Sequence, residues 1–329
     1  MIIKQEIEDL GRLNNMKRVI TGVILAFLLV GTLLLRNVSL AFFDALIGVL
    51  LVIASMEICN AQEKRGKSNI KYLSMLYPIF MYILYVMAIN NQYGIWFIIL
   101  SQALLLLTFA FVAFVCQFIY QLVLNRKSKN KVSAQKNFKN SLCVCLNTFV
   151  TFVYPSLFLG LLFVFNHFSG FAFASSNTIL TTNIETILIA LIFLITFSTD
   201  IFAFCVGSVF KGPKLCPLIS PKKTISGAIG GIIASVFTLT ITFYILNAIS
   251  AFNSFFDVTG LNLLIFIIVA IIGSIISQLG DIFASLIKRK SGIKDFGTIL
   301  PGHGGIIDRF DGVIFNTVFV LILSCILLF

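Results

Sequence analysis

Apolar stretches long enough to cross a lipid bilayer recur along most of this 329-residue chain. Hydrophobic residues make up 59% of the sequence, and charged residues only 11%. An apolar run of about 18 or more residues is typical of a transmembrane helix, since about 20 residues span the hydrocarbon core. The sequence therefore predicts an all-α fold, a polytopic integral membrane helical bundle of about nine transmembrane helices. The expected spans are 19–35, 39–58, 72–89, 94–125, 141–166, 183–206, 225–248, 261–284 and 312–329.

Basic residues concentrate in alternate loops between these spans. Of the 24 Lys and Arg residues, 23 fall in the N-terminal segment or in four predicted loops, and only Arg36 lies elsewhere. The four loops are 59–71, 126–140, 207–224 and 285–311. The positive-inside rule then places the N-terminus in the cytoplasm. We expect a multi-pass protein of the plasma membrane, with the lipid bilayer as a partner and the functional site on the cytoplasmic face.

The net charge of +11 is explained by this topology. Aromatic residues are not interleaved with the charges of the most basic loop, so we expect no nucleic-acid partner.

A polar segment at 280–312 stands out against the apolar background. Asp281, at the inner end of the predicted eighth span, is followed four, seven and eight residues later by Ser285, Lys288 and Arg289. These spacings place the four side chains on one face of a helix. A carboxylate, a hydroxyl and two cations in one row suit a metal-bound phosphate. The alternative for the two cations alone is that they reach from a helix end to the polar interface.

Aspartates also mark two other predicted spans. Asp308 and Asp311 open the last span three residues apart, so a helix would point both the same way. Mg²⁺ prefers one or two carboxylates with phosphate oxygens and water, and capping of the helix start is the alternative role. Asp200 lies near the inner end of span six, where an ionisable residue by default indicates function. Its alternative is a hydrogen bond to the neighbouring Ser198 or Thr199.

Two short loops add groups that suit phosphate. In the glycine-rich turn at 300–305, Gly304 and Gly305 would let backbone N–H groups approach phosphate oxygens. His303 in this turn is compatible with three roles, as a phosphate donor, a proton carrier or a structural donor. The loop before span seven holds hydroxyl and basic groups that suit a triphosphate, or that serve only as a positive membrane flank. Its residues are Ser220, Lys222, Lys223 and Thr224.

Together these residues resemble the signature of the phosphatidate cytidylyltransferase family, whose members make CDP-diacylglycerol. The resemblance rests on the run from Ser285 to Arg289, Lys294-Asp295, the turn from Leu300 to Gly305, and the run from Asp308 to Asp311. The upstream stretch from Asp200 to Gly227 resembles a second motif of the family. The sequence departs from the family pattern in four places, and these are the pair Lys211-Gly212, Ser226, Ala284 and Gly312.

The resemblance implies a catalytic transmembrane region at 181–329, with cytoplasmic loops 207–224 and 285–311. The N-terminal transmembrane helices at 1–180 match only in general character. The implied reaction transfers CMP from CTP to phosphatidate and releases pyrophosphate. Mg²⁺ is the implied cofactor, with a second metal ion left open, and a homodimer is the implied assembly.

The resemblance also implies residue roles. Asp281 and Asp308 are the expected metal ligands, with Asp200 and Asp311 as further ligands or as residues that hold them. The expected catalytic residues are Asp281, Asp308, Asp311, Lys288, Arg289 and His303. The expected phosphate-binding residues are Ser220, Lys222, Lys223, Thr224, Ser285, Lys294, Arg309, Gly304 and Gly305.

Two other functions are alternatives. Another membrane enzyme that handles CTP or a lipid phosphate, such as a CTP-dependent polyprenol kinase, would share these charges. An anion transporter would favour inverted repeats and charges at the bilayer midplane, and the sequence shows neither pattern.

Overall fold

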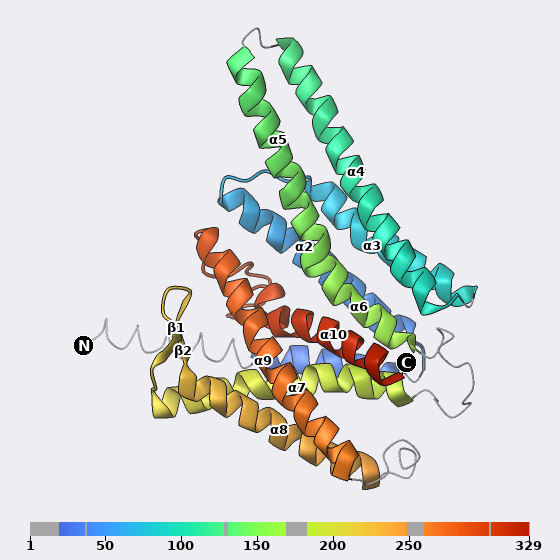
Figure 1. The fold of residues 1–329 in the computed structure, drawn as a ribbon, viewed down its shortest axis with the longest axis vertical. Helices are drawn as coiled ribbons and strands as arrows, with labels where there is room; N and C mark the ends of the chain where they lie inside the picture. Colours follow the sequence, from blue (N-terminus) through green and yellow to red (C-terminus); the bar gives the residue numbers. More distant parts are fainter. Residues whose placement is uncertain are drawn as a thin grey trace. The chain divides into compact units, whose positions relative to one another are not determined.

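The computed structural model describes residues 20–36, 38–91, 93–127, 131–168, 183–248, 260–302 and 304–328, most of them helical (Figure 1). A first helix, Ile20–Leu35, precedes α2. The helices that follow are α2 (Ala41–Lys64), α3 (Lys71–Asn90), α4 (Ile95–Lys127), α5 (Lys131–Thr151), the π-helix η1 (Phe152–Leu157), α6 (Phe158–Asn166), α7 (Asn183–Phe210), α8 (Ile225–Ala248), α9 (Gly260–Lys290) and α10 (Ile307–Leu328). A short antiparallel hairpin, β1 (Lys214–Cys216) and β2 (Ser220–Thr224), is the exception to all-α structure among the described residues.

Eight of the described helices are long and apolar enough to cross a membrane, which confirms the predicted polytopic membrane fold. Helix Ile20–Leu35, the predicted first span, is shorter than these eight. The total of nine spans and the cytoplasmic N-terminus therefore stay predictions.

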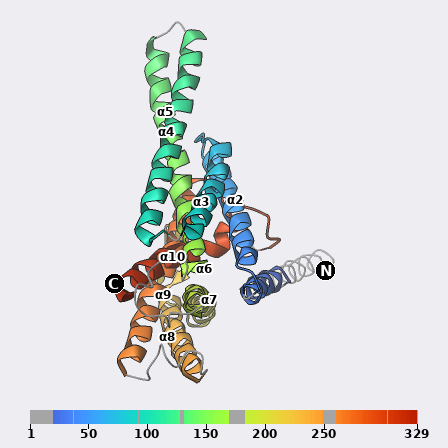
Figure 2. The same cartoon turned by 90° about the vertical axis from the view of Figure 1, so that its right-hand side faces the viewer.

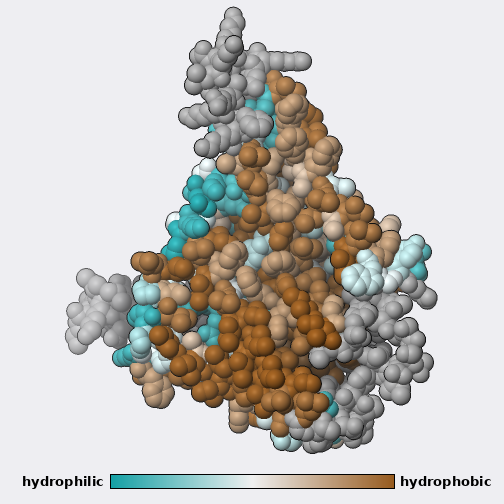
Figure 3. All heavy atoms as spheres, viewed as in Figure 1, coloured by the Kyte–Doolittle hydropathy of each residue, from teal (hydrophilic) through white to brown (hydrophobic). Residues whose placement is uncertain are grey.

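Apolar side chains cover much of the visible surface of the described helices (Figure 3). Phe27, Trp96 and Phe204 are 80%, 74% and 76% exposed. Exposed aromatic side chains in such number are stable against lipid, whereas in water they would drive association.

The most basic predicted loop, 126–140, is largely helical. α4 continues to Lys127, and α5 begins at Lys131. The prediction of a loop is wrong here because Lys, Gln and Ala are good helix formers, so the helical backbone continues beyond the apolar part of each span. Figures 1 and 2 show α4 and α5 side by side as a long helical hairpin.

The chain forms two compact units. Unit 1 comprises residues 1–172 and 290–309, and unit 2 comprises residues 173–289 and 310–329. The predicted division into 1–180 and 181–329 stays a prediction. The two units nevertheless show that the polar loop after α9 packs with the N-terminal helices.

Aromatic rings pack between α3, α4 and η1 in unit 1. The Tyr77 ring stacks on Phe152 with 5.0 Å between centroids and meets the edge of Phe109 at 5.4 Å. Nearby, the Ser55 hydroxyl of α2 lies 2.9 Å from the Ser156 hydroxyl of η1. The Ser55–Ser156 contact therefore joins α2 to η1, and the aromatic rings join η1 to α3 and α4.

Close packing of α7 against α8 organises unit 2. A Cβ added to Gly227 would lie 2.6 Å from the Ala203 carbonyl oxygen, and one added to Gly231 would lie 2.9 Å from that of Thr199. Small residues at a helix interface allow backbones to approach closely in membranes. A hydrophobic cluster of α7, α8 and α9 lies further along the same helices, and its buried members are Ile187, Leu191, Ile195, Leu239, Phe243, Phe266, Val269 and Ala270.

Candidate active site

The β1–β2 hairpin of unit 2 is held against the end of α9 by two charged contacts. The Lys223 Nζ lies 2.6 Å from the Asp281 Oδ2. The Arg289 Nε donates a hydrogen bond of 3.1 Å to the Ile219 carbonyl oxygen. The structure therefore brings the loop before α8 together with the predicted charged row on α9, although the two are about 60 residues apart in sequence.

The predicted row on α9 lies within one continuous helix. The Ser285 hydroxyl donates to the Asp281 Oδ1 at 3.4 Å, one helical turn away. Lys288 is half-buried and Arg289 is exposed. These side chains follow the four-residue spacing from which their common face was predicted.

Three aspartates of unit 2 interact electrostatically. Asp311, at the start of α10, is 4% exposed. Its carboxylate interacts electrostatically with the charges of Asp281, Asp200 and Lys288. Its own Oδ1 accepts the Gly312 backbone N–H at 2.8 Å. Carboxylates from α7, α9 and α10 thus share one region with lysines from α9 and β2. Ionisable side chains that apolar helices bring together in this way indicate a functional site by default.

This donor set fits Mg²⁺. No three His, Cys, Asp or Glu side chains within the described part of the chain converge into a complete metal-binding group. Mg²⁺ does not need one, because it commonly takes one or two carboxylates and fills its other positions with phosphate oxygens and water. The aspartates of unit 2 can supply that number of carboxylates.

Thr224 has a structural role that its sequence context did not indicate. It is buried and precedes α8, and its hydroxyl accepts the Gly227 backbone N–H at 3.1 Å, as a helix N-cap does. Its role in phosphate binding stays a prediction. Ser220 is half-buried in β2, and Lys222 beside Lys223 is exposed.

Two of the departures from the family pattern contact each other. The Gly212 backbone N–H donates to the Ser226 hydroxyl at 3.2 Å. A Cβ at position 212 would lie 3.0 Å from the same oxygen, so this arrangement suits glycine. Lys211 beside it has a φ of 42°, a conformation that L-residues rarely adopt.

The glycine-rich loop belongs to unit 1, where Asp308 organises it. The Asp308 Oδ2 accepts the backbone N–H groups of Phe296 at 2.8 Å and Gly305 at 2.9 Å. Gly304 has a φ of 89°, and a Cβ there would lie 2.8 Å from the same oxygen. Asp308 therefore shapes the loop, in addition to its predicted role as a metal ligand.

The remaining predicted residues fall in or near this loop. Lys294 and Arg309 are exposed. His303 lies outside the described residues. The single composite site that the sequence suggested stays a prediction.

Glu57 was missed by the sequence analysis. It is 2% exposed, and its Oε1 and Oε2 accept the backbone N–H groups of Ile306 at 2.9 Å and Ile307 at 3.0 Å. The signal was available, because a glutamate inside a predicted span is an ionisable group at membrane depth. The sequence did not show which groups Glu57 binds, because Ile306 and Ile307 lie 249 and 250 residues away.

The fold and these charged groups define a multi-pass membrane protein with a candidate phosphate- and metal-binding site. The model of the cytidylyltransferase family matches residues 16–327, and the chain belongs to this family. The resemblance seen in the sequence is confirmed at the level of the family.

Relatives named phosphatidate cytidylyltransferase share part of the chain. A protein of Rickettsia conorii is 41% identical over 137 residues, covering 42% of this chain and 57% of the relative. One of Staphylococcus haemolyticus is 44% identical over 123 residues, covering 37% and 43%. One of Brucella melitensis is 42% identical over 126 residues, covering 38% and 42%. The chain thus spans about half the length of the relatives it matches.

Proposed function

We propose that the chain is a phosphatidate cytidylyltransferase, an enzyme that transfers CMP from CTP to phosphatidate. The observation that carries this proposal is the Lys223–Asp281 pair, which joins the two stretches that resemble the family's motifs. The names of the relatives support the same reaction.

In this reaction a phosphatidate phosphate oxygen attacks the α-phosphorus of CTP. A new phosphorus–oxygen bond forms, the bond to the β-phosphate breaks, and pyrophosphate leaves with the electron pair. Both substrates are polyanions, so catalysis depends on in-line positioning and on neutralising their charge.

The cations of the hairpin and of α9 suit this task. Lys222 and Lys223 on β2 and Arg289 on α9 would bind phosphate oxygens, and the Arg289 contact to Ile219 keeps the hairpin beside the helix. Asp281, with Asp200 and Asp311, would hold Mg²⁺, which when bound offsets the charge of the phosphates and of the leaving pyrophosphate.

We further propose that the site faces the cytoplasm from the plasma membrane and that the protein forms a homodimer. CTP is water-soluble, and phosphatidate has acyl chains that stay in the bilayer. A cluster of charged side chains at the ends of membrane helices would contact both CTP from the water and the phosphate of phosphatidate in the bilayer. The distribution of Lys and Arg between loops supports the cytoplasmic side.

The test is an assay of purified protein with CTP, phosphatidate and Mg²⁺, with pyrophosphate release as the readout. We expect turnover by the wild type, its loss on chelation of the metal, its return with added Mg²⁺, and a fall of about 100-fold or more in Asp281→Asn. Lys214→Gln, which removes an exposed charge from β1, is the control.

Two results would overturn the proposal. One is a wild type that releases no pyrophosphate with phosphatidate, and the other is full activity in Asp281→Asn. A parallel reaction with a polyprenol in place of phosphatidate tests the kinase alternative, in which CDP rather than pyrophosphate would be released.

A further inference from the structure

The carboxylate of Glu57 caps the start of α10 from a different helix. Glu57 lies near the end of α2, and each of its oxygens accepts one backbone N–H, that of Ile306 or that of Ile307. The first N–H groups of a helix have no partners within the helix, and a negative charge at that end is favourable. Glu57 supplies both the acceptors and the charge.

Two glycines leave room for this carboxylate. A Cβ added to Gly297 would lie 2.5 Å from the Glu57 Oε1, and one added to Gly305 would lie 2.5 Å from both carboxylate oxygens. The loop backbone therefore packs directly on Glu57 from two points eight residues apart. A side chain at either glycine would displace the carboxylate or the loop.

Glu57 and Asp308 act on the same short stretch of backbone. Gly305 packs against Glu57, and its N–H is bound by the Asp308 Oδ2. Ile307, the residue before Asp308, is bound by Glu57. The position of the Asp308 carboxylate is thus fixed by a network in which Glu57 holds the backbone on its N-terminal side.

We propose that Glu57 is a positioning residue, which orients Asp308 by holding the first turn of α10. This inference rests on the proposed function, and on the role of Asp308 as a metal ligand that the family resemblance implies. Residues that hold a metal ligand typically change metal affinity or activity by about 10- to 100-fold when they are replaced.

The test compares Glu57→Gln with Glu63→Gln. Both remove one negative charge from α2, but Glu63 is exposed and pairs at its surface with Lys71. In Glu57→Gln one carboxylate oxygen, which is an acceptor, is replaced by an amide NH2 group, which is a donor that faces a backbone N–H. We expect kcat to fall about 10- to 100-fold and the Mg²⁺ concentration for half-maximal rate to rise, with KM for phosphatidate unchanged.

A third variant, Glu57→Asp, guards against simple loss of folding. It keeps the charge with a shorter reach, so its kcat and Mg²⁺ requirement should fall between those of the wild type and Glu57→Gln. A merely structural role would not move the Mg²⁺ requirement. Values for Glu57→Gln that equal those of Glu63→Gln would overturn the proposal.

Hydrogen exchange at Ile306 and Ile307 separates this inference from the proposed function. Faster exchange is expected in Glu57→Gln, while the Gly227 amide, capped by Thr224, stays unchanged as an internal reference. If the wild type transfers no CMP, the proposed function fails and exchange alone decides on Glu57. Faster exchange then supports its hold on α10, and unchanged exchange overturns it.

Discussion

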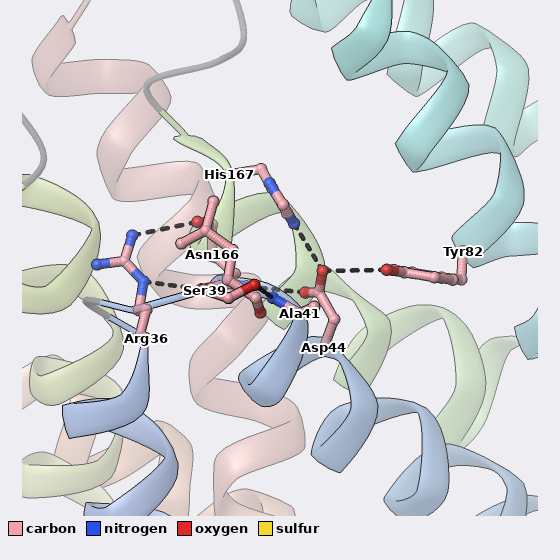
Figure 4. Close-up of polar contacts among 8 residues, drawn as sticks. Arg36, Ser39, Ala41, Asp44, Tyr82, Asn166 and His167 are labelled. Atoms are coloured by element: carbon pink, nitrogen blue, oxygen red, sulfur yellow. Dashed lines mark hydrogen bonds and ion pairs between the residues drawn. The ribbon is translucent and has the colours of Figure 1, made fainter.

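Asp44 and His167 lie 123 residues apart in the chain, and their side chains meet with 2.7 Å between the Asp44 Oδ2 and the His167 Nε2 (Figure 4). The same carboxylate accepts hydrogen bonds from the Tyr82 hydroxyl at 3.2 Å and the Asn166 amide at 2.8 Å. Asn166 in turn accepts two hydrogen bonds from Arg36, at 2.7 Å and 3.1 Å. One buried carboxylate therefore ties α2, α3 and the end of α6 together within unit 1.

Replacing Asp44 should destabilise the fold according to how many partners lose their acceptor. Asp44→Ala leaves three donors without an acceptor, and we expect a loss of about 3–5 kcal/mol. Asp44→Asn keeps one acceptor, and we expect a loss of about 1–3 kcal/mol. Thermal unfolding in detergent measures both. Val38→Ala, at a position that is 78% exposed, is the control, and an Asp44→Ala variant as stable as this control would contradict the expectation.

Lys223 should matter for activity far more than its neighbours on the hairpin. Lys223→Met removes the cation that pairs with Asp281, and we expect kcat/KM for CTP to fall about 100-fold. Lys214→Met removes an exposed lysine on the opposite strand and should leave the rate near that of the wild type. Steady-state assays over a range of CTP concentrations distinguish the two. Equal losses in both variants would mean that only the overall charge of the hairpin matters.

The sequence predicts the membrane helices well because a span needs a long apolar run, and such runs are visible in the residues themselves. The prediction fails where the backbone conformation does not depend on an apolar run. The polar start of α5 at 131–139 is helical through propensity, and the β1–β2 hairpin forms inside the predicted loop 207–224.

The candidate site also has parts that the sequence could predict and parts that it could not. The row from Asp281 to Arg289 was predictable because four-residue spacing directly encodes a helix face. The contact of Glu57 with Ile306 and that of Asp44 with His167 were not, because each spans more than 120 residues and local spacing holds no information about it. Both are carboxylates inside predicted spans, and that alone would have marked them for attention.

Gly227 should tolerate alanine much less well than another helical glycine does. A methyl group at Gly227 would press on the Ala203 carbonyl oxygen, and overpacking of this kind costs about 1–3 kcal/mol. Gly48 in α2 has nothing within 4 Å of an added Cβ, so alanine there should be neutral or stabilising by about 0.5–1 kcal/mol. Unfolding temperatures of the two variants should therefore move in opposite directions, or only that of Gly227→Ala should fall. A similar fall in both would count against close packing of α7 and α8.

A pair of substitutions at Asp308 separates its role in shaping the loop from its predicted role as a metal ligand. Both loop N–H groups bind a single oxygen, Oδ2, so the carbonyl oxygen of Asp308→Asn can still accept from Phe296 and Gly305. The loop should keep its shape, with amide exchange near that of the wild type, while loss of the charge lowers activity and raises the Mg²⁺ requirement. Asp308→Ala removes the acceptor as well, so exchange at Phe296 and Gly305 should accelerate and activity should fall at least as far. Wild-type activity in Asp308→Asn, together with loss of activity in Asp308→Ala, would show that Asp308 shapes the loop and does not bind the metal.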